Sequence, residues 1–268
     1  MKSRFSDPNY LRSDQYKNAA NLTARAQLHA RFSVNKLGWH RWLFEQLDLP
    51  ETARLLEIGC GPAWLWAENA ERIPGGWQIT LSDFSSGMIE EAQAKLKMVP
   101  RVFTFDVIDA QSIPYPEATF DAVIANHMLY HVPDRVKAIS EFWRVLKPGG
   151  QLYAATNGEG HLRELDELTA RFTSASLWEG FSIAGTFTLE NGAAQLTDQF
   201  SSVTMKRYAD GLIVTEVEPL MAYALSGRGK EILTGDQIEA FARFIEQEIS
   251  KTGAIHISKD AGLFVARK

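Results

Sequence analysis

From Arg54 to Thr156, short apolar runs alternate with segments whose apolar residues recur every three or four positions. The runs predict strands and the recurring segments predict helices, because side chains share a face every second residue in a strand and about every 3.6 residues in a helix. We expect strands at 54–58, 77–82, 101–106, 120–125 and 150–156, and helices near 63–72, 86–98 and 134–146. This alternation predicts a parallel sheet covered by helices on both faces.

The flanking segments follow other patterns. Residues 1–15 are polar and predicted to be loose, whereas residues 16–48 are predicted to form two helices. Beyond Thr156, the pattern predicts a helix at 161–174, a glycine-containing loop, a strand near 200–208, helices at 215–225 and 234–251, and a last strand at 261–267. The two late strands bring the expected sheet to seven strands.

This order of elements predicts three parts. Residues 1–48 are expected to form an N-terminal helical cap, and residues 49–156 the ligand-binding core of the sheet. Residues 157–268 are expected to supply a lid insertion after the fifth strand and then to complete the sheet. The cap and the insertion are natural candidates to enclose a ligand, because binding residues concentrate on loops held by a rigid scaffold.

Composition narrows the class of protein. With 268 residues, 45% of them hydrophobic, the chain suits one large domain or one domain with an added cap. The net charge of −5 shows no basic face for nucleic acid, and no apolar run approaches the roughly 18 residues of a membrane span. Cys60 is the only cysteine, so no internal disulfide forms. A soluble cytoplasmic enzyme without nucleic-acid or membrane partners fits these limits.

The most informative segment runs from Arg54 to Ala63, where an apolar strand leads through Glu57 into a tight glycine loop. Glycine lets the backbone approach a ligand closely and tolerates positive φ. Asp83 ends the next predicted strand, and an acid in that place accepts hydrogen bonds from ribose hydroxyls. The two segments predict a crevice for a nucleoside-containing cofactor.

A dinucleotide is one alternative for that crevice. Dinucleotide folds use the pattern G-x-G-x-x-G, whose third glycine permits close packing of helix on strand beneath a pyrophosphate. Here Gly59 and Gly61 are followed by Trp64 at the third position, which argues against an NAD-type oxidoreductase.

The whole stretch resembles the class I S-adenosylmethionine (SAM) methyltransferases of the methyltransferase domain 11 type. The resemblance is carried, in the right order and spacing, by Leu56-Glu57-Ile58-Gly59-Cys60-Gly61-Pro62, Leu81-Ser82-Asp83-Phe84-Ser85-Ser86-Gly87-Met88, Asp109-Ala110-Gln111-Ser112-Ile113-Pro114-Tyr115-Pro116, Phe120-Asp121-Ala122-Val123-Ile124-Ala125-Asn126 and Leu146-Lys147-Pro148-Gly149-Gly150. Ala63 departs from the family, which has a third glycine there. The resemblance implies a Rossmann-like fold and SAM as cofactor, with S-adenosylhomocysteine (SAH) as product.

The resemblance also implies roles for particular residues. Glu57, Gly59, Cys60 and Gly61 would surround the methionine and ribose part of SAM, and Asp83 would hold the ribose hydroxyls. Phe84 or Met88 would flank the adenine. Asp109 would accept from the adenine amino group, with Asp106 as an alternative, and the backbone of Ala110 would meet the ring. Asn126 and His127, after the fourth strand, would lie near the transferring methyl.

Three further expectations concern catalysis and the cap. His127 is a candidate general base, and the other interpretation makes it a cofactor or substrate contact. Arg25 shares a helix face with Leu22 and Phe32, so Arg25 or Tyr16 is expected near the SAM carboxylate, or else Arg25 extends to solvent. No metal site is expected.

The sequence therefore predicts methyl transfer to a small-molecule acceptor by direct in-line displacement. A non-catalytic SAM-binding regulatory protein remains an alternative, because methyl transfer requires alignment more than a distinctive catalytic group. The acceptor and the methylated atom stay open. The oligomeric state also stays open, although an N-terminal helix arm can exchange between subunits of a homo-oligomer.

Overall fold

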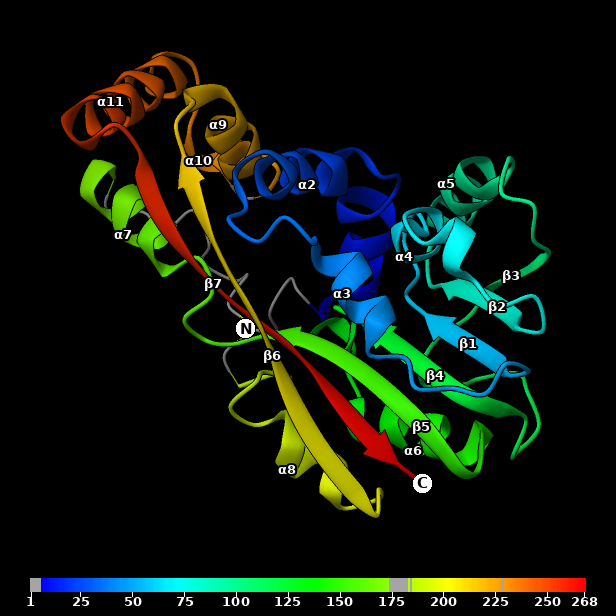
Figure 1. Cartoon of the computed structure of the whole chain (residues 1–268). Helices are drawn as coiled ribbons and strands as arrows, with labels where there is room; N and C mark the ends of the chain where they lie inside the picture. The colour runs from blue at the N-terminus through cyan, green and yellow to red at the C-terminus, as the bar shows by residue number, and fades with distance from the viewer. Residues whose placement is uncertain (1–5, 174–182, 184, 228) are drawn as a thin grey trace.

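A seven-stranded mixed sheet forms the centre of the molecule, with strand order β3-β2-β1-β4-β5-β7-β6 (Figure 1). In this computed structural model, residues 6–173, 183, 185–227 and 229–268 are described. Strands β1 to β5 are parallel, β7 is antiparallel to β5, and β6 is antiparallel to β7. The α/β fold predicted from the alternating pattern is confirmed.

The strands are β1 Arg54–Ile58, β2 Gln78–Asp83, β3 Phe103–Val107, β4 Phe120–Asn126, β5 Leu146–Asn157, β6 Ser202–Val214 and β7 Ile255–Arg267. The helices are α1 Pro8–Tyr10, α2 Ala20–Phe32, α3 Trp39–Glu45, α4 Trp64–Ala67, α5 Ser86–Leu96, α6 Arg135–Val145, α7 Arg163–Phe172, α8 Gly192–Thr197, α9 Val217–Leu225, α10 Gly229–Ile232 and α11 Asp236–Thr252. Three short turns of helix are η2 Leu11–Gln15, η3 Ala70–Arg72 and η4 Leu129–His131.

Three predictions about local structure were wrong. Residues 8–15 are helical rather than loose, because the Asp7 side chain accepts from the backbone N–H groups of Asn9 and Tyr10 and starts α1. The predicted helix at 63–72 is divided into α4 and η3. The short helix α8 was not predicted. Residues 174–182, part of the predicted lid insertion, lie outside the described residues.

Strands β6 and β7 are much longer than their sequence pattern suggested, at 13 residues each. They pair with one another over their whole length, from Ser202 opposite Arg267 to Val214 opposite Ile255. Only the last part of β7 also pairs with β5, from Ala261 to Arg267. The rest of the ribbon extends beyond the sheet toward α9 and α11, as Figure 1 shows.

Apolar side chains form three buried clusters. One lies on the face of the sheet covered by α6 and α8, and a second lies on the face covered by α3, α4 and α5. The third joins the extended ends of β6 and β7 to α2, α7, α9 and α11. Because α2 belongs to this third cluster, the N-terminal cap packs against the ribbon as well as against the sheet.

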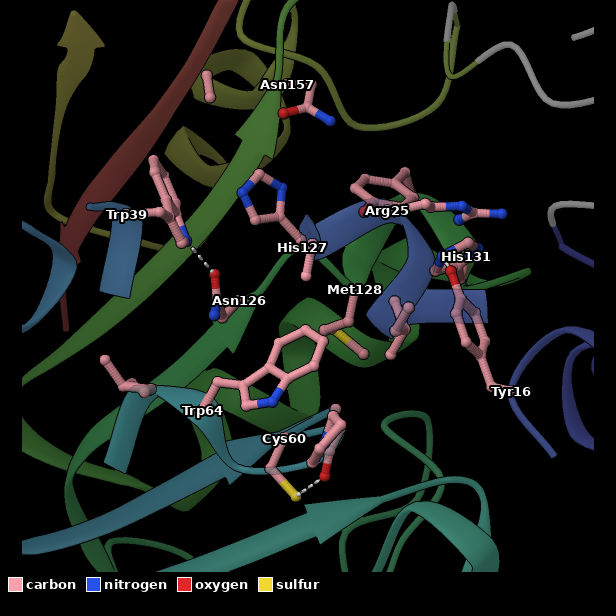
Figure 2. A pocket seen from close by; sticks show the side chains of 18 of the residues that line it. Tyr16, Arg25, Trp39, Cys60, Trp64, Asn126, His127, Met128, His131 and Asn157 are labelled. Atoms are coloured by element: carbon pink, nitrogen blue, oxygen red, sulfur yellow. Dashed lines mark hydrogen bonds between the residues drawn. The ribbon is translucent and has the colours of Figure 1, made fainter. Parts of the chain in front are cut away.

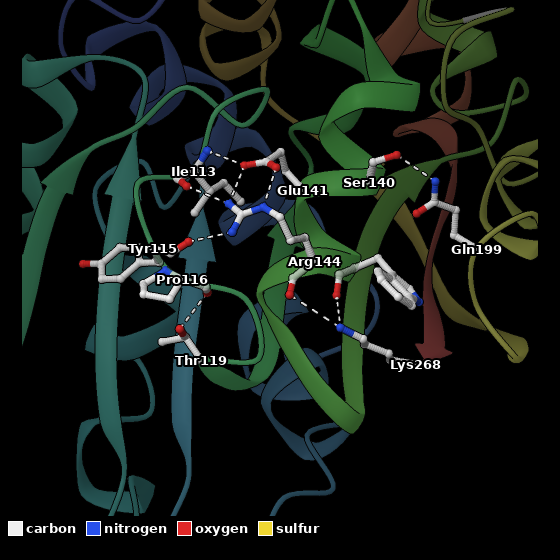
Figure 3. A network of polar contacts seen from close by, with 10 residues as sticks. Ile113, Tyr115, Pro116, Thr119, Ser140, Glu141, Arg144, Gln199 and Lys268 are labelled. Carbon is white, nitrogen blue, oxygen red and sulfur yellow. Dashed lines mark hydrogen bonds and ion pairs between the residues drawn. The ribbon is translucent and has the colours of Figure 1, made fainter.

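Arg144 attaches the loop at 109–116 to α6 (Figure 3). Its guanidinium donates to the backbone carbonyls of Ile113 and Tyr115, at 2.9 and 2.7 Å, and pairs with Glu141 at 2.7 Å. Glu141 in turn accepts from the Ile113 N–H at 2.8 Å. This network holds both backbone groups of Ile113, so the position of the loop depends on one ion pair.

We predict that Arg144→Met destabilises the protein by about 1–3 kcal/mol, because charged hydrogen bonds to two carbonyls are lost. Urea denaturation measures the loss, and hydrogen exchange of the Ile113 amide locates it. Arg101→Met is the matched control, since Arg101 binds the Ile73 carbonyl far from the loop. Unchanged protection of the Ile113 amide in the Arg144 variant would contradict the assigned role.

Candidate active site

A cavity of about 1120 Å³ lies at the carboxyl ends of the parallel strands, beneath the N-terminal helices. It opens where the chain order reverses, between β1 and β4, and ligands of open α/β sheets bind at this kind of switch point. Pockets for a single small ligand measure roughly 300–1,000 Å³. The cavity therefore has room for a nucleoside cofactor and a second small molecule together.

The loop after β1 forms one wall of the cavity and depends on positive φ angles. Gly59 and Gly61 have φ of 73° and 52°, and Ala63 adopts 58°. A Cβ built on Gly59 would lie 2.8 Å from the Cβ of Met128, so only glycine fits between loop and neighbour. Ala63 occupies the third position of the loop in the left-handed backbone conformation, although it is not a glycine.

Asp83 lies at the end of β2 and joins this loop to the next turn. Its carboxylate accepts from the Gly61 N–H at 3.0 Å and from the Ser85 N–H at 2.9 Å. It also lines the cavity. Burial raises the pKa of Asp83 to about 6, although the backbone hydrogen bonds from Ser85 and Gly61 act in the opposite direction. An acceptor group at this point suits the hydroxyls of a ribose.

Glu57 does not line the cavity. Its carboxylate is buried behind the loop and accepts from the indole N–H of Trp66 at 2.5 Å. Burial raises the pKa of Glu57 to about 7. Cys60 lines the cavity beside the loop, and burial raises the pKa of its thiol, so it is a poor nucleophile. Of the two tryptophans after the loop, Trp66 is core and Trp64 lies on the cavity wall.

The loop after β3 brings another acid to the cavity. Asp109 lines it together with Ala110, and its carboxylate accepts from the Gln111 N–H at 2.9 Å. Asp106, the alternative considered from the sequence, lies outside the cavity lining and accepts from the Tyr115 hydroxyl. Phe84 and Met88 also reach the wall, on the side of Asp83. The structure thus brings the residues predicted for the adenine side to one cavity: Phe84, Met88, Asp109 and Ala110.

Asn126 ends β4 and His127 follows it, and both face the cavity from the side opposite the glycine loop, as Figure 2 shows. The Asn126 side-chain oxygen accepts from the indole N–H of Trp39 at 3.1 Å, and the Trp39 and His127 rings lie 4.8 Å apart. His127 has φ of 56°, an uncommon value for a residue other than glycine. Burial lowers the pKa of His127 to about 3, so its imidazole is neutral.

Two residues of the cap reach the same cavity. The Tyr16 hydroxyl lies 2.8 Å from Nε2 of His131, and the Tyr16 carbonyl accepts from the Ser85 hydroxyl at 2.9 Å. Arg25 projects from α2. Its guanidinium donates to the hydroxyl of Ser226 at 2.9 Å and to the backbone carbonyl of Ser226 at 3.2 Å. Tyr16 therefore ties the cap to the segment after β4, and Arg25 is held toward the cavity rather than in solvent (Figure 2).

Sequence reasoning missed a group of wall residues: Trp39, His161 and Lys259. Lys259 stands in the long strand β7, whose extension was not predicted, and His161 stands just before α7. His29, on the same helix as Arg25, also lines the cavity. No local pattern marks these residues, because they meet through long-range packing. Among the described residues, no group of three or more histidines, cysteines or acids is placed to hold a metal ion.

Comparison with known proteins identifies the domain. Residues 56–154 match the family model described as a methyltransferase domain. The chain is 32% identical over 120 residues to methyltransferase GfsG of Streptomyces halstedii, covering 42% of this chain and 41% of that protein. It is also 32% identical over 115 residues to the ubiquinone/menaquinone biosynthesis C-methyltransferase UbiE of Geobacter sulfurreducens, covering 42% and 45%.

A solved structure of similar fold is phosphoethanolamine N-methyltransferase 2 of Haemonchus contortus in complex with SAM. It covers 98% of this chain and 60% of that one, with a TM-score of 0.61 and 18% identity. At this identity the likeness shows the fold. A mixed sheet with a glycine loop and an acid at the switch point defines the class of nucleotide-binding α/β proteins.

Within that class, residues 56–154 form a methyltransferase domain of the class I SAM-dependent type, as the motifs predicted. The match favours this interpretation over the dinucleotide alternative. The chain spans 41% to 45% of the lengths of the two curated relatives above. In the part of the chain that the structure describes, no helix is long and apolar enough to cross a membrane.

The buried carboxyl of Glu57 gives a prediction about pH. Its folded pKa of about 7 exceeds the ordinary 4.5, so the unfolded chain loses its proton first and stability falls as pH rises between those values. We predict that Glu57→Gln, which keeps an acceptor for Trp66, gains stability over wild type by about 3 kcal/mol between pH 4.5 and 7.5. Urea denaturation at several pH values measures the difference.

Asp83 is present in both proteins, and its charge adds to the burial that raises the pKa of Glu57. Glu141→Gln is the control of opposite sign below pH 4.5. Because Arg144 holds the pKa of Glu141 below its usual 4.5, wild type loses the contribution of Glu141 only as pH falls under that value. A stability difference between Glu57→Gln and wild type that stays constant across the pH range given for Glu57 would show that the Glu57 carboxyl titrates normally.

Proposed function

We propose that the protein is a SAM-dependent methyltransferase that acts on a small molecule by direct in-line displacement. The single observation that carries this proposal is the Asp83 carboxylate, bound to the glycine-loop N–H of Gly61 and facing a cavity with room for two ligands. The family match supports the activity class.

The residues present fit the cofactor. Gly59 and Gly61 let the loop approach the methionine part, Asp83 accepts from the ribose hydroxyls, and Asp109 with Ala110 meets the adenine edge. Phe84 and Met88 supply apolar surface for the adenine. Arg25, which has no carboxylate partner among the described residues, pairs with the carboxylate of the methionine part. Bound SAM supplies a methyl group on a sulfonium, whose leaving group is a neutral thioether.

The chain's own residues then have to align the acceptor and exclude water. Asn126 is held by Trp39, and His127 is held against the Trp39 ring, so both groups are oriented before the acceptor arrives. A neutral imidazole with a pKa of about 3 is a weak base. His127 therefore serves as a hydrogen-bonding contact that orients the nucleophile. This role replaces the role of general base that the sequence suggested for it.

The acceptor is a small molecule because the cap covers the cavity. Tyr16, Arg25 and Trp39 come from the N-terminal segments, and each lines the cavity from above the strand ends. The names of the relatives point to different chemistry, ubiquinone and menaquinone biosynthesis for UbiE and phosphoethanolamine for the Haemonchus contortus enzyme. These names support methyl transfer to small molecules. They do not agree on one acceptor, so the acceptor has to be inferred from the residues that line the cavity.

Calorimetry with SAM and SAH tests the proposal directly. We predict that Asp83→Asn weakens SAM binding by more than about tenfold, because an anionic acceptor of two hydroxyl hydrogen bonds is lost. Asp106→Asn is the matched control, since Asp106 lies in the neighbouring strand β3, outside the cavity lining. Formation of SAH across a library of small-molecule acceptors then separates an enzyme from a SAM-binding regulator. Absence of SAM and SAH binding by the wild-type protein would refute the proposal.

The tie between Tyr16 and His131 gives a second prediction. Tyr16→Phe removes the hydroxyl that holds the cap to the segment after β4, so SAH is expected to bind about five- to tenfold more weakly. Tyr153→Phe is the control, because the Tyr153 hydroxyl is also hydrogen-bonded but accepts from the Asp48 N–H away from the cavity. Equal dissociation constants for the Tyr16 and Tyr153 variants would show that the cap closes without this bond.

A further inference from the structure

One part of the cavity wall, away from the glycine loop, carries buried histidines and a lysine; we call the space beside it the inner chamber. Its walls are the cavity-lining residues contributed by α2, the segment after β4, the start of α7, α9 and β7, namely His29, His127, His161, Leu162, Tyr223 and Lys259. The His29 and His161 rings stack at 6.3 Å, and the Tyr223 ring meets His29 edge-on at 6.0 Å.

Lys259 directs a cation into this chamber. Its ammonium pairs with Asp210 at 2.5 Å, donates to the Ser33 hydroxyl at 3.1 Å and lies 5.5 Å from the centre of the Tyr208 ring, so one of its three N–H groups has no hydrogen bond to an oxygen within the described residues. Asp210 has a fully buried side chain and does not line the cavity, whereas Lys259 does. Asp210 also accepts from the backbone N–H of Asn35 at 2.9 Å. The ion pair is therefore oriented, with its positive end toward the chamber.

His161 offers a second donor. Its Nδ1 accepts from the Asp260 N–H at 3.1 Å. Burial lowers the pKa of His161 to about 3, so the ring is neutral and its one proton lies on Nε2. The neutral ring therefore keeps its remaining hydrogen-bonding atom, an N–H, for a ligand.

Two buried imidazole nitrogens in the same chamber lack partners. Nδ1 of His29 and Nδ1 of His127 are each buried without a hydrogen bond within the described residues. An unsatisfied buried polar atom costs about 1–3 kcal/mol, so a polar ligand that fills the chamber recovers part of that cost. Asp83 and Asp109 line the cofactor part of the cavity, and Glu68 lines it as well. The two lining acids from the segments next to the chamber, Glu159 and Asp166, are both exposed.

We propose that the inner chamber binds the oxyanion of the methyl acceptor, a carboxylate or a phosphate, through the Lys259 ammonium and the His161 Nε2–H. This inference rests on the proposed function, because the chamber adjoins the place assigned to the transferring methyl at Asn126 and His127. It deepens that function by naming an acidic small molecule as the substrate class.

Calorimetry with benzoate and its uncharged analogue benzamide, and separately with inorganic phosphate, tests the chamber. Each probe is titrated into the free protein and into protein saturated with SAH. Benzoate or phosphate is expected to bind at least about tenfold more tightly than benzamide. Benzoate binding alone identifies a carboxylate site, and phosphate binding alone identifies a phosphate site. Equal binding of benzoate and benzamide without phosphate binding, or no binding of either anion at millimolar concentration, overturns the proposal.

Variants assign the binding to the named groups. Lys259→Met combined with Asp210→Asn removes both charges of the ion pair, so no buried charge is left alone, and the new amide oxygen still accepts from the Asn35 N–H. His161→Asn places an oxygen near the position of Nδ1 for the Asp260 N–H and removes the Nε2–H. Both are expected to lower anion affinity by about tenfold. Lys206→Met, a lysine of β6 outside the cavity lining, is the control.

The two proposals fail separately. If SAH does not bind, the proposed function fails, and the anion titration of the free protein still decides the chamber. If SAH binds and the wild-type protein shows no preference for an anion, only the acidic acceptor is refuted. Anion binding that survives unchanged in both the double variant and His161→Asn places the oxyanion elsewhere and refutes the assigned chamber. Circular dichroism and thermal unfolding establish that each variant is folded.

Discussion

The hydrogen bonds that Asp83 accepts are the constraint on which the cofactor half of the site depends. One carboxylate receives the Gly61 N–H from the loop after β1 and the Ser85 N–H from the turn after β2. These two loops are separate in sequence, and the acid fixes their spacing at the switch point of the sheet. Burying a carboxylate is costly, and this cost is reflected in the pKa of Asp83, which rises to about 6.

The part of the cavity that we propose for the acceptor depends on a different feature, the long two-stranded ribbon of β6 and β7. Because these strands pair beyond the edge of β5, they carry Lys259 and its partner Asp210 to the cap and to the start of α7. A buried ion pair gives little net stability, since desolvation offsets the attraction between the charges. In the proposed anion site, its orientation with the ammonium toward the cavity gives the ribbon a role in recognition as well as in packing.

Neutral groups dominate the region between the two halves. His29, His127 and His161 are all held uncharged by burial, with the pKa of each lowered to about 3. Such a region suits a reaction whose leaving group is already activated, because the protein needs to orient the acceptor rather than to exchange protons with it. Trp39 and Asn126 illustrate this, since an indole of the cap holds an amide at the end of β4.

The sequence by itself determined the parallel half of the sheet and the cofactor motifs. Strands β1 and β4, the glycine loop and the acid at Asp83 are read from local apolar runs, glycine spacing and strand-end position, all of which act over a few residues. It left open whether Arg25 faces the cavity or extends to solvent, and the structure places Arg25 at the cavity wall, bound to Ser226. Only the tertiary structure decided which side chains share one cavity. Glu57 turned to Trp66 and away from the cavity, whereas Lys259 and His161 joined it from segments with no recognisable motif. Contacts between residues more than a hundred positions apart, such as Tyr16 with His131, are set by packing, on which local propensity carries no information.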